Sequence, residues 1–304
     1  PYGRASQGAA YTLLAKLYLN AEVYTNTSKY TECISACQQA IAQGYSLEDD
    51  YSSLFNADND KRTANEIIFT LPVDATHTVS WGSSTYIICG AVSNTSDKQV
   101  PEDYGVKSGW GMFRVRGEIP ALFTGEADQR YLFFTDGQTQ YLNKIDDQSN
   151  GFFVTKWTNL TDNGQTASNT ADGGVNTDYP LFRLADVYLM MAEAVVRGGT
   201  GSDRGTVLGY INELQRRAYG DDEHKIADSD LTLDFLLKER ARELYWEGHR
   251  RTDLIRYGMF TTDKYLWQWK GGEKGGTAVN SKYNIYPIPN TELTANPNLY
   301  NENY

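Results

Sequence analysis

Residues 239–258 read ERARELYWEGHRRTDLIRYG, and nine of these twenty side chains are Arg, Glu or Asp. Arg240, Glu243 and Glu247 follow one another at steps of three and four residues, so they form one stripe along a helix. Gly248 is suited to end that helix or to let another backbone approach closely. The stretch therefore predicts a charged helix followed by a second element, and it raises the question whether the charges catalyse or stabilise.

Two interpretations of the stripe can be compared. A retaining glycosidase needs two carboxyl groups about 5 Å apart, a separation that Glu243 and Glu247 could reach on one helix. The arginines between them lower the pKa of a carboxyl group, which suits an ion pair and hinders a general acid. We therefore expect a structural role, with Arg240, Glu243, Glu247, Arg250 and Asp253 mostly buried and paired.

Composition bounds the class of protein. The chain has 304 residues, of which 40% are apolar and 22% charged, enough for a folded core. Its net charge of −11 disfavours nucleic acid as a partner. The 22 Tyr, 6 Trp and 11 Phe offer flat apolar rings, a surface that suits sugars or peptides, although most Tyr are expected in helix contacts.

Motifs for metal or cofactor chemistry are missing from the sequence. The histidines His77, His224 and His249 show no metal-ligand spacing, and no GxSxG, GxxxxGK[ST] or HExxH pattern occurs. Cys33 and Cys37 stand at helical spacing and Cys89 is remote, so buried reduced thiols are expected. We expect no cofactor, no metal and no catalytic site.

Helical pairs are expected near both ends of the chain. Apolar residues recur with helical period in residues 6–24 and 30–41, and again in 179–199 and 205–220. In the first helix Ser6 is a plausible N-cap. Its inward face is expected to contain Ala10, Leu14, Leu17, Tyr18 and Ala21. Pairs of this kind, joined by short turns, resemble tetratricopeptide units.

Between these blocks the periodicity fails. Short strands are expected at IIFTLPV, RYLFF, TQYL and FFVTKW, with TDGQ as a hairpin turn between RYLFF and TQYL. Long polar loops are expected at 161–178 and 270–280. The fold class is thus mainly α: tetratricopeptide-like helical pairs with a long irregular segment containing a few short strands. We expect a single domain over 1–304, with a helical scaffold (1–70 and 179–304) and a loop-rich ligand-binding segment (71–178).

Four segments together resemble the SusD/RagB family. The pattern of residues 239–258 falls on Glu239-Arg240, Glu243-Leu244, Glu247-Gly248, Arg250, Asp253-Leu254, Arg256 and Gly258. The tail YPIPNTELTANPNLYNENY, the segment YPLFRLADVYLMMAEA and the opening GRASQGAAYTLLAKLYL are also similar to the family. The resemblance covers both ends of the chain.

The resemblance implies a binding protein and not an enzyme. Members are lipid-anchored, bind oligosaccharide or polysaccharide at the outer surface of Gram-negative bacteria, and deliver it to a TonB-dependent SusC-like transporter. The family's signal peptide, lipidated cysteine and N-terminal helices are not found in this sequence, which looks like a segment of a longer protein, so membrane attachment is expected only through an anchor that this chain lacks. A tetratricopeptide-type protein- or peptide-binding scaffold is the alternative, and an enzyme ranks last.

Trp81, Tyr86 and Trp110 are the best candidates for ligand binding. They stand in the aperiodic segment among glycines and serines, in VSWGSSTYIICG and KSGWGMF. Gly109 and Gly111 leave Trp110 with little local cover and allow close backbone approach. Burial of Trp110 beneath the loop is an equally open alternative.

Other candidates are weaker. Asn94, Asp103 and Arg114 could bond to sugar hydroxyls. Trp267 and Trp269 alternate in YLWQWK, which suggests a strand edge or packing. Which glycan is bound, and whether a peptide is the ligand instead, cannot be read from the sequence.

Overall fold

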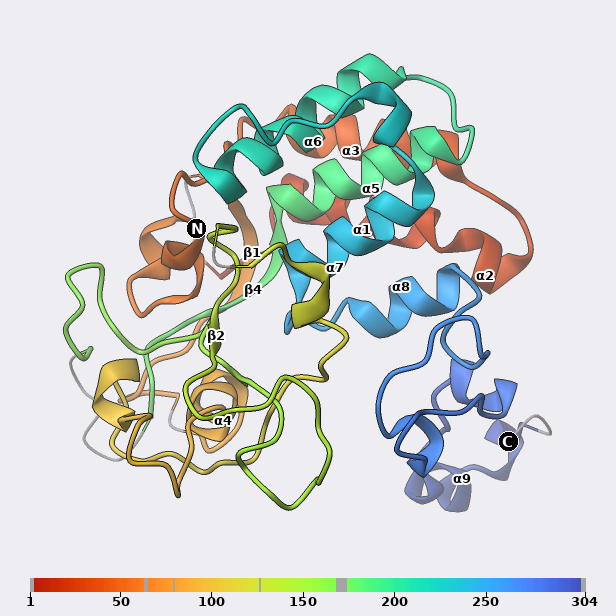
Figure 1. Cartoon of the computed structure of the whole chain (residues 1–304). Coiled ribbons are helices and arrows are strands. Elements are labelled where there is room, and N and C mark those ends of the chain that lie inside the picture. The colour runs from red at the N-terminus through yellow and green to blue at the C-terminus, as the bar shows by residue number, and fades with distance from the viewer. Residues whose placement is uncertain (1–2, 63–64, 79, 126, 168–173, 302–304) are drawn as a thin grey trace. The chain divides into compact units, whose positions relative to one another are not determined.

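The computed structural model describes residues 3–62, 65–78, 80–125, 127–167 and 174–301 (Figure 1). Its contacts divide the chain into two units, residues 1–248 and 249–304. Among the described residues, no helix combines the length and apolar character needed to cross a membrane. The helices far outweigh the short strands, so the chain is mainly α, as predicted.

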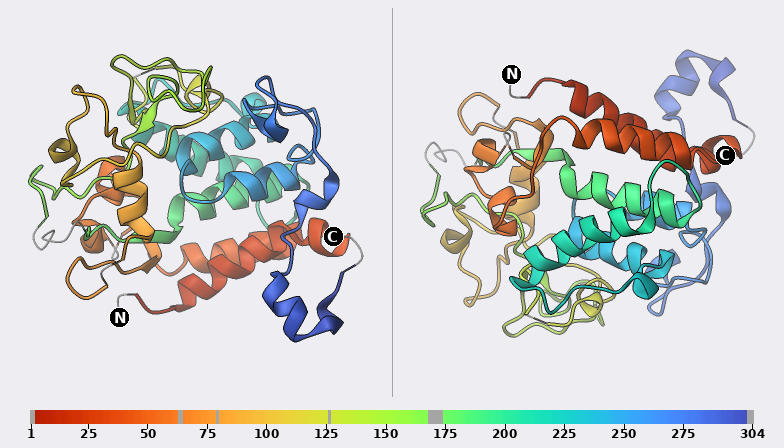
Figure 2. Two further views of the ribbon diagram at one scale, coloured as in Figure 1. Left: turned by 90° about the horizontal axis from the view of Figure 1, so that it is seen from below. Right: turned by 90° about the horizontal axis from the view of Figure 1, so that it is seen from above.

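Five helices form the scaffold of the first unit: α1 (Gln7–Leu19), α3 (Tyr30–Ile41), α5 (Leu184–Val196), α6 (Arg204–Tyr219) and α7 (Leu233–Leu244). Helix α1 packs against α3, α3 against α5, and α5 against both α6 and α7 (Figure 1). Figure 2 shows α1 and α3, in red and orange, side by side with the green α5 next to them. The two helical pairs, distant in sequence, thus share one core, as stacked tetratricopeptide-like pairs do.

The first expected helix is interrupted. Ser6 is its N-cap, accepting a hydrogen bond from the backbone N–H of Ala9 at 3.2 Å. The prediction of one helix over 6–24 is wrong, because α1 ends at Leu19 and a short helix α2 (Ala21–Thr25) follows. At the break, the side-chain amide of Asn20 donates to the carbonyl of Lys16 at 2.8 Å and caps the last turn of α1.

The buried face of α1 also differs from the expected one. Four of the five buried residues are small, Gly8, Ala9, Thr12 and Ala15, and the fifth is Leu19 in the last turn. Leu14 and Leu17, expected inward, are 39% and 48% exposed. Small residues let α1 lie close to its neighbours, and a Cβ at Gly8 would stand 2.5 Å from the hydroxyl of Tyr45. Leu13, Leu14 and Leu17 instead form an apolar stripe that the described residues leave uncovered.

The other scaffold helices follow their sequence patterns. In α3 the buried residues include Cys33, Ile34 and Cys37, and all three cysteines of the chain are buried free thiols. In α6 the expected residues Ile211 and Leu214 are fully buried. A 3.6-residue period was therefore a sufficient signal wherever large side chains face the core.

Residues 179–183, expected to open a helix, form the strand β4 (Tyr179–Arg183) instead. It pairs antiparallel with β1 (Ile67–Leu71), with Ile67 opposite Arg183 and Leu71 opposite Tyr179. Pro180 disfavours a helix interior. Pairing with a strand more than 100 residues away then decides the local structure.

The loop-rich segment contains little regular structure. Strand β2 (Phe133–Phe134) pairs with β3 (Phe153–Val154), so the predicted hairpin between RYLFF and TQYL is wrong. Residues 139–142 form no strand, and Thr139 makes only an isolated bridge to Asn150. The remaining elements of this unit are α4 (Ser83–Gly90), η1 (Tyr51–Phe55), η2 (Asn59–Arg62), η3 (Pro101–Tyr104), η4 (Pro120–Leu122) and η5 (Asp228–Asp230). Of the long loop at 161–178, residues 168–173 lie outside the described residues.

The second unit contains α8 (Arg250–Arg256), α9 (Asn290–Ala295), η6 (Lys270–Gly272), η7 (Ser281–Asn284) and η8 (Pro297–Leu299). The strand edge suggested by YLWQWK is not found, because residues 265–269 form bends, turns and irregular backbone, and Trp269 has φ +65°. The ammonium of Lys270 holds this loop by donating to the carbonyls of Thr262 (2.5 Å) and Tyr265 (2.9 Å).

Candidate functional site

The charged stripe of α7 is the centre of a buried ion network. Glu243 is fully buried and accepts hydrogen bonds from Arg217 (2.5 Å), Arg183 (2.9 Å) and Arg130 (3.2 Å). These three arginines come from α6, β4 and the loop before β2. One carboxylate therefore joins the helical scaffold to the loop-rich segment.

The network continues around Glu243. Glu247 accepts from Lys156 at 2.6 Å and from Arg183 at 2.7 Å. Glu66, just before β1, accepts from Arg183 and Arg217, both at 2.6 Å. We call the following residues the charged frame: Glu66, Asp128, Arg130, Lys156, Arg183, Arg217, Glu239, Glu243 and Glu247.

The prediction that the charged stretch is buried and paired is confirmed at four of its five residues. Besides Glu243 and Glu247, Arg240 is buried and pairs with Asp186 at 2.9 Å. In the second unit, Asp253 is buried and pairs with Arg256 at 2.7 Å. Arg250 is only partly buried.

Electrostatics in the charged frame favour permanent ion pairs. Burial alone raises the pKa of Glu243, but the positive charges of Arg217, Arg183 and Arg130 outweigh burial and hold that pKa well below its usual range. Burial lowers the pKa of Lys156 to about 8, although Glu247 opposes the shift. A carboxyl group that stays ionised in this way cannot donate a proton as a general acid.

The three predicted aromatic residues lie together. The ring of Trp110 is 5.9 Å from that of Trp81 and 6.1 Å from that of Tyr86, between centroids. Phe113, which the sequence analysis did not single out, packs edge-on against Tyr86 at 4.7 Å. We call Trp81, Tyr86, Trp110 and Phe113 the aromatic cluster. Phe113 stands three residues after Trp110 in the same glycine-flanked stretch, a position that could have marked it.

The rings differ in their exposure. Trp81 is 67% exposed and Tyr86 is 40% exposed. Trp110 is half-buried and packs against the core that contains Tyr51 and Trp157. Trp110 thus anchors the loop and also keeps part of its ring at the surface.

Backbone contacts hold the cluster in place. The N–H of Trp110 donates to the carbonyl of Cys89, and that of Phe113 to the carbonyl of Gly90, both at 2.8 Å. A Cβ at Gly109 would lie 2.2 Å from the carbonyl oxygen of Ser93, so only glycine fits there. The rings are therefore carried on a backbone pinned to the end of α4.

Two of the three polar residues considered near the cluster have other partners. The guanidinium of Arg114 donates to the carbonyl oxygens of the loop 145–150, including that of Ile145 at 2.6 Å. Asn94 accepts from the amide of Gln148 at 2.7 Å, whereas Asp103 is exposed. Arg114 and Asn94 thus shape the loops around the cluster.

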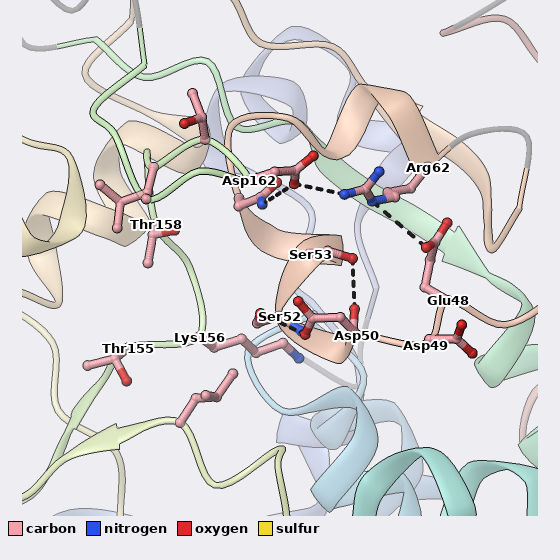
Figure 3. A pocket seen from close by; sticks show the side chains of 15 residues that line it. Glu48, Asp49, Asp50, Ser52, Ser53, Arg62, Thr155, Lys156, Thr158 and Asp162 are labelled. Atoms are coloured by element: carbon pink, nitrogen blue, oxygen red, sulfur yellow. Dashed lines mark hydrogen bonds and ion pairs between the residues drawn. The ribbon is translucent and has the colours of Figure 1, made fainter. Parts of the chain in front are cut away.

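A separate polar cavity of about 580 Å³ lies beside η1 and η2 (Figure 3). In it Arg62 stands between Asp162 (2.7 Å) and Glu48 (3.8 Å), and Asp50 accepts from the backbone N–H of Ser52 at 2.9 Å. The described residues that line it include no aromatic ring. In the described part of the chain no three His, Cys, Asp or Glu are placed to hold a metal. The aromatic cluster remains the better candidate site for sugar rings.

Comparisons with known proteins identify the family. The model described as SusD family matches residues 123–304. The starch-binding protein SusD of Bacteroides thetaiotaomicron is 35% identical over 353 residues, covering 100% of this chain and 61% of that protein. The chain belongs to the SusD family. SusD-like protein P25 of Formosa agariphila is 25% identical and is matched over 98% of this chain and 58% of its own length.

Solved structures share the fold of this SusD-family chain. Surface glycan-binding protein A of Bacteroides thetaiotaomicron, in complex with laminarihexaose, aligns with a TM-score of 0.72 at 22% identity, over 100% of this chain and 65% of that one. A SusD superfamily protein of Parabacteroides distasonis also aligns with a TM-score of 0.72 at 22% identity, over 99% of this chain and 64% of that one. The chain thus spans about three fifths of the length of the curated relatives it matches.

SusD and surface glycan-binding protein A are named as binding proteins and not as enzymes. The predicted SusD/RagB family is confirmed, and both of these named relatives are binding proteins. This agrees with the charged frame, whose carboxylates are fully engaged with arginine and lysine.

Proposed function

We propose that this chain binds an oligosaccharide or polysaccharide at the aromatic cluster without chemical change. The observation that carries the proposal is that the rings of Trp81 and Tyr86 each lie about 6 Å from that of Trp110, with Trp81 67% and Tyr86 40% exposed. A pyranose ring has an apolar C–H face that packs on an aromatic ring, and its hydroxyls bond to water or polar groups at the edge.

The geometry favours a chain of sugars over a single one. Trp81 and Trp110 are inclined by 52°, and Tyr86 and Trp110 by 56°, so the rings do not form one flat platform. Rings tilted in this way can each face a different sugar unit of a curved chain. The names of relatives supply the ligand class, since one is a starch-binding protein and another was solved with laminarihexaose.

The proposal includes a place and a partner. The protein acts at the outer surface of a Gram-negative cell, held there by a lipid anchor, and passes the bound glycan to a TonB-dependent SusC-like transporter. Support comes from membership of the SusD family. Co-purification tests this part separately. The full-length protein should retain the SusC-like transporter when the two are expressed together, and it should not retain an unrelated transporter.

Calorimetric titration with maltoheptaose and with laminarihexaose tests the glycan site. Each stacked ring contributes about 0.5–1.5 kcal/mol beyond its buried area, so Trp81→Ala, Tyr86→Ala and Trp110→Ala should each weaken binding several-fold or more. Tyr24→Ala is the matched control, because Tyr24 is 61% exposed but lies on α2, outside the cluster.

Circular dichroism of each variant separates a local loss from unfolding. Trp81→Ala is the most informative variant, since its side chain contributes least to the core. Unchanged affinity in all three cluster variants, with a glycan that the parent binds, would refute the site. Release of shorter sugars during the titration would instead contradict binding without catalysis.

A further inference from the structure

A second ligand-sized pocket lies entirely within the second unit. Its volume is about 650 Å³, within the range of roughly 300–1,000 Å³ that small-molecule sites have. Aromatic and apolar side chains make up most of its wall. The lining includes Arg251, Phe260, Trp267, Lys270, Tyr283 and Tyr286.

The pocket contains a cation with unused hydrogen-bond capacity. The guanidinium carbon of Arg251 lies 3.8 Å from the ring centroid of Tyr286 and 5.1 Å from that of Phe260. One terminal nitrogen donates to the carbonyl of Tyr283 at 2.7 Å. Among the described residues no carboxylate pairs with Arg251, so most of its five N–H donors remain available.

The surroundings add positive potential. The ammonium of Lys270 is buried beneath the pocket, 4.6 Å from the ring of Trp267, and donates to backbone carbonyls. Residues 249–304 carry seven Lys and Arg against five Asp and Glu, a net charge of +2 in a chain whose net charge is −11. The second unit is therefore the cationic part of an acidic protein.

Exposed rings stand beside this cation. Tyr286 is 73% exposed and Tyr283 is 53% exposed, and each has a phenolic hydroxyl at its edge. Trp267 stacks on Phe260 with centroids 5.8 Å apart and forms an apolar wall. Ring faces suit the C–H face of a sugar, and a guanidinium suits a carboxylate or sulfate by paired N–H donors.

We propose that this pocket is a second saccharide site, selective for anionic oligosaccharides that carry carboxylate or sulfate groups. Arg251 binds the acidic group, and the exposed faces of Tyr283 and Tyr286 pack against the sugar rings. The choice of a saccharide rests on the proposed glycan-binding function, whereas the selectivity for negative charge rests only on this pocket. Neutral and anionic sugars would then bind at different places on the same protein.

The test is calorimetry with tetragalacturonate, an oligomer of uronic acids, at 25 and at 250 mM NaCl. The parent should bind it, and the affinity should fall several-fold with added salt because a charge contact is screened. Arg251→Gln should lower the affinity at least tenfold, and Tyr286→Ala several-fold. Lys274→Gln is the matched control, because it removes one positive charge from an exposed residue of the same unit that does not line the pocket.

Three results would overturn the proposal. The first is no binding of tetragalacturonate at 25 mM NaCl. The second is an equal effect of Arg251→Gln and Lys274→Gln, which would indicate diffuse attraction. The third is loss of tetragalacturonate binding in Trp81→Ala, which would place the ligand in the aromatic cluster. If Arg251→Gln lowers the melting temperature, the tetragalacturonate affinity of Tyr286→Ala becomes the test, since that exposed ring supports little of the fold. An unchanged affinity in Tyr286→Ala would then overturn the proposal.

The proposals for the two sites can be refuted independently of each other. Loss of laminarihexaose binding in the cluster variants, with tetragalacturonate binding intact, supports both sites. Tetragalacturonate binding without any binding of neutral glycans would contradict the aromatic cluster and leave the second pocket standing.

Discussion

Removal of the Glu243 carboxylate is the sharpest test of the charged frame. The side chain is fully buried and accepts from three guanidinium groups, those of Arg130, Arg183 and Arg217. In Glu243→Ala these cations lose their common partner, and water cannot replace it without opening the core. Breaking a buried pair by deleting one partner costs about 3–5 kcal/mol, because it leaves uncompensated charge.

The expected change in melting temperature follows from the size of the unit. A loss of about 3–5 kcal/mol, at roughly 2–4 °C per kcal/mol for a domain of this size, lowers the melting temperature by roughly 6–20 °C. Glu243→Gln keeps the shape and part of the hydrogen bonding, so its effect should be intermediate. Differential scanning calorimetry at pH 7 measures both variants.

Asp234→Ala is the control on the same helix. Its side chain is 72% exposed and pairs with Lys238 at 2.7 Å in the first turn of α7. An exposed pair contributes less than about 1 kcal/mol, so this variant should melt within a few degrees of the parent. If Glu243→Ala melts like Asp234→Ala but loses glycan binding, the carboxylate serves the ligand and the frame interpretation is wrong.

Two further predictions concern pH and backbone packing. Asp178 is buried and accepts from the N–H of Val73 at 2.6 Å, and burial raises its pKa to about 6. The unfolded value is about 3.9, so between pH 4 and 6 the folded state binds more protons, and the stability from this group falls as pH rises through that window. Urea titrations at pH 4.5 and 7 measure the free energy of unfolding, which should change less with pH in Asp178→Asn than in the parent. An equal change in both proteins would assign the pH dependence to other groups. Gly109→Ala should displace Trp110 by collision with Ser93 and weaken maltoheptaose binding without removing a ring. Gly209→Ala in α6, where a Cβ meets nothing within 4 Å, should bind like the parent, and equal affinity of the two variants would contradict the close fit at Gly109.

Local periodicity predicted most of the helical scaffold and failed where packing depends on small residues. Helices α3, α6 and α7 bury most of the residues that their sequence pattern indicates, although in α6 Leu208 is only partly buried. In α1 the longest side chains are exposed, because close approach to the neighbouring helices selects the glycine and alanine side. Strand β4 could not be predicted from local sequence either, since residues 179–183 form a strand by pairing with the distant β1.

The candidate site was partly predictable for a different reason. Trp81, Tyr86 and Trp110 could be chosen because large rings among glycines and serines have little local cover. Their mutual distances could not be predicted, since they depend on how residues 109–113 pack onto the end of α4. The partners of Glu243 were equally hidden, because Arg130 precedes it by 113 residues and carries no motif of its own.

The charged frame and the aromatic cluster are joined by a series of rings. Trp246, three residues after Glu243, holds the positive φ of 61° and packs edge-on against Phe113 at 6.1 Å. Phe113 in turn contacts Tyr86, whose ring lies beside Trp110. A loop-borne sugar site gains affinity only if its rings are ordered before the ligand arrives, because ordering them on binding offsets the contact energy. Directional ion pairs supply order where sheet structure is sparse. Under the proposed function, the buried charges of α7 therefore support the position of the aromatic cluster through the contact between Trp246 and Phe113.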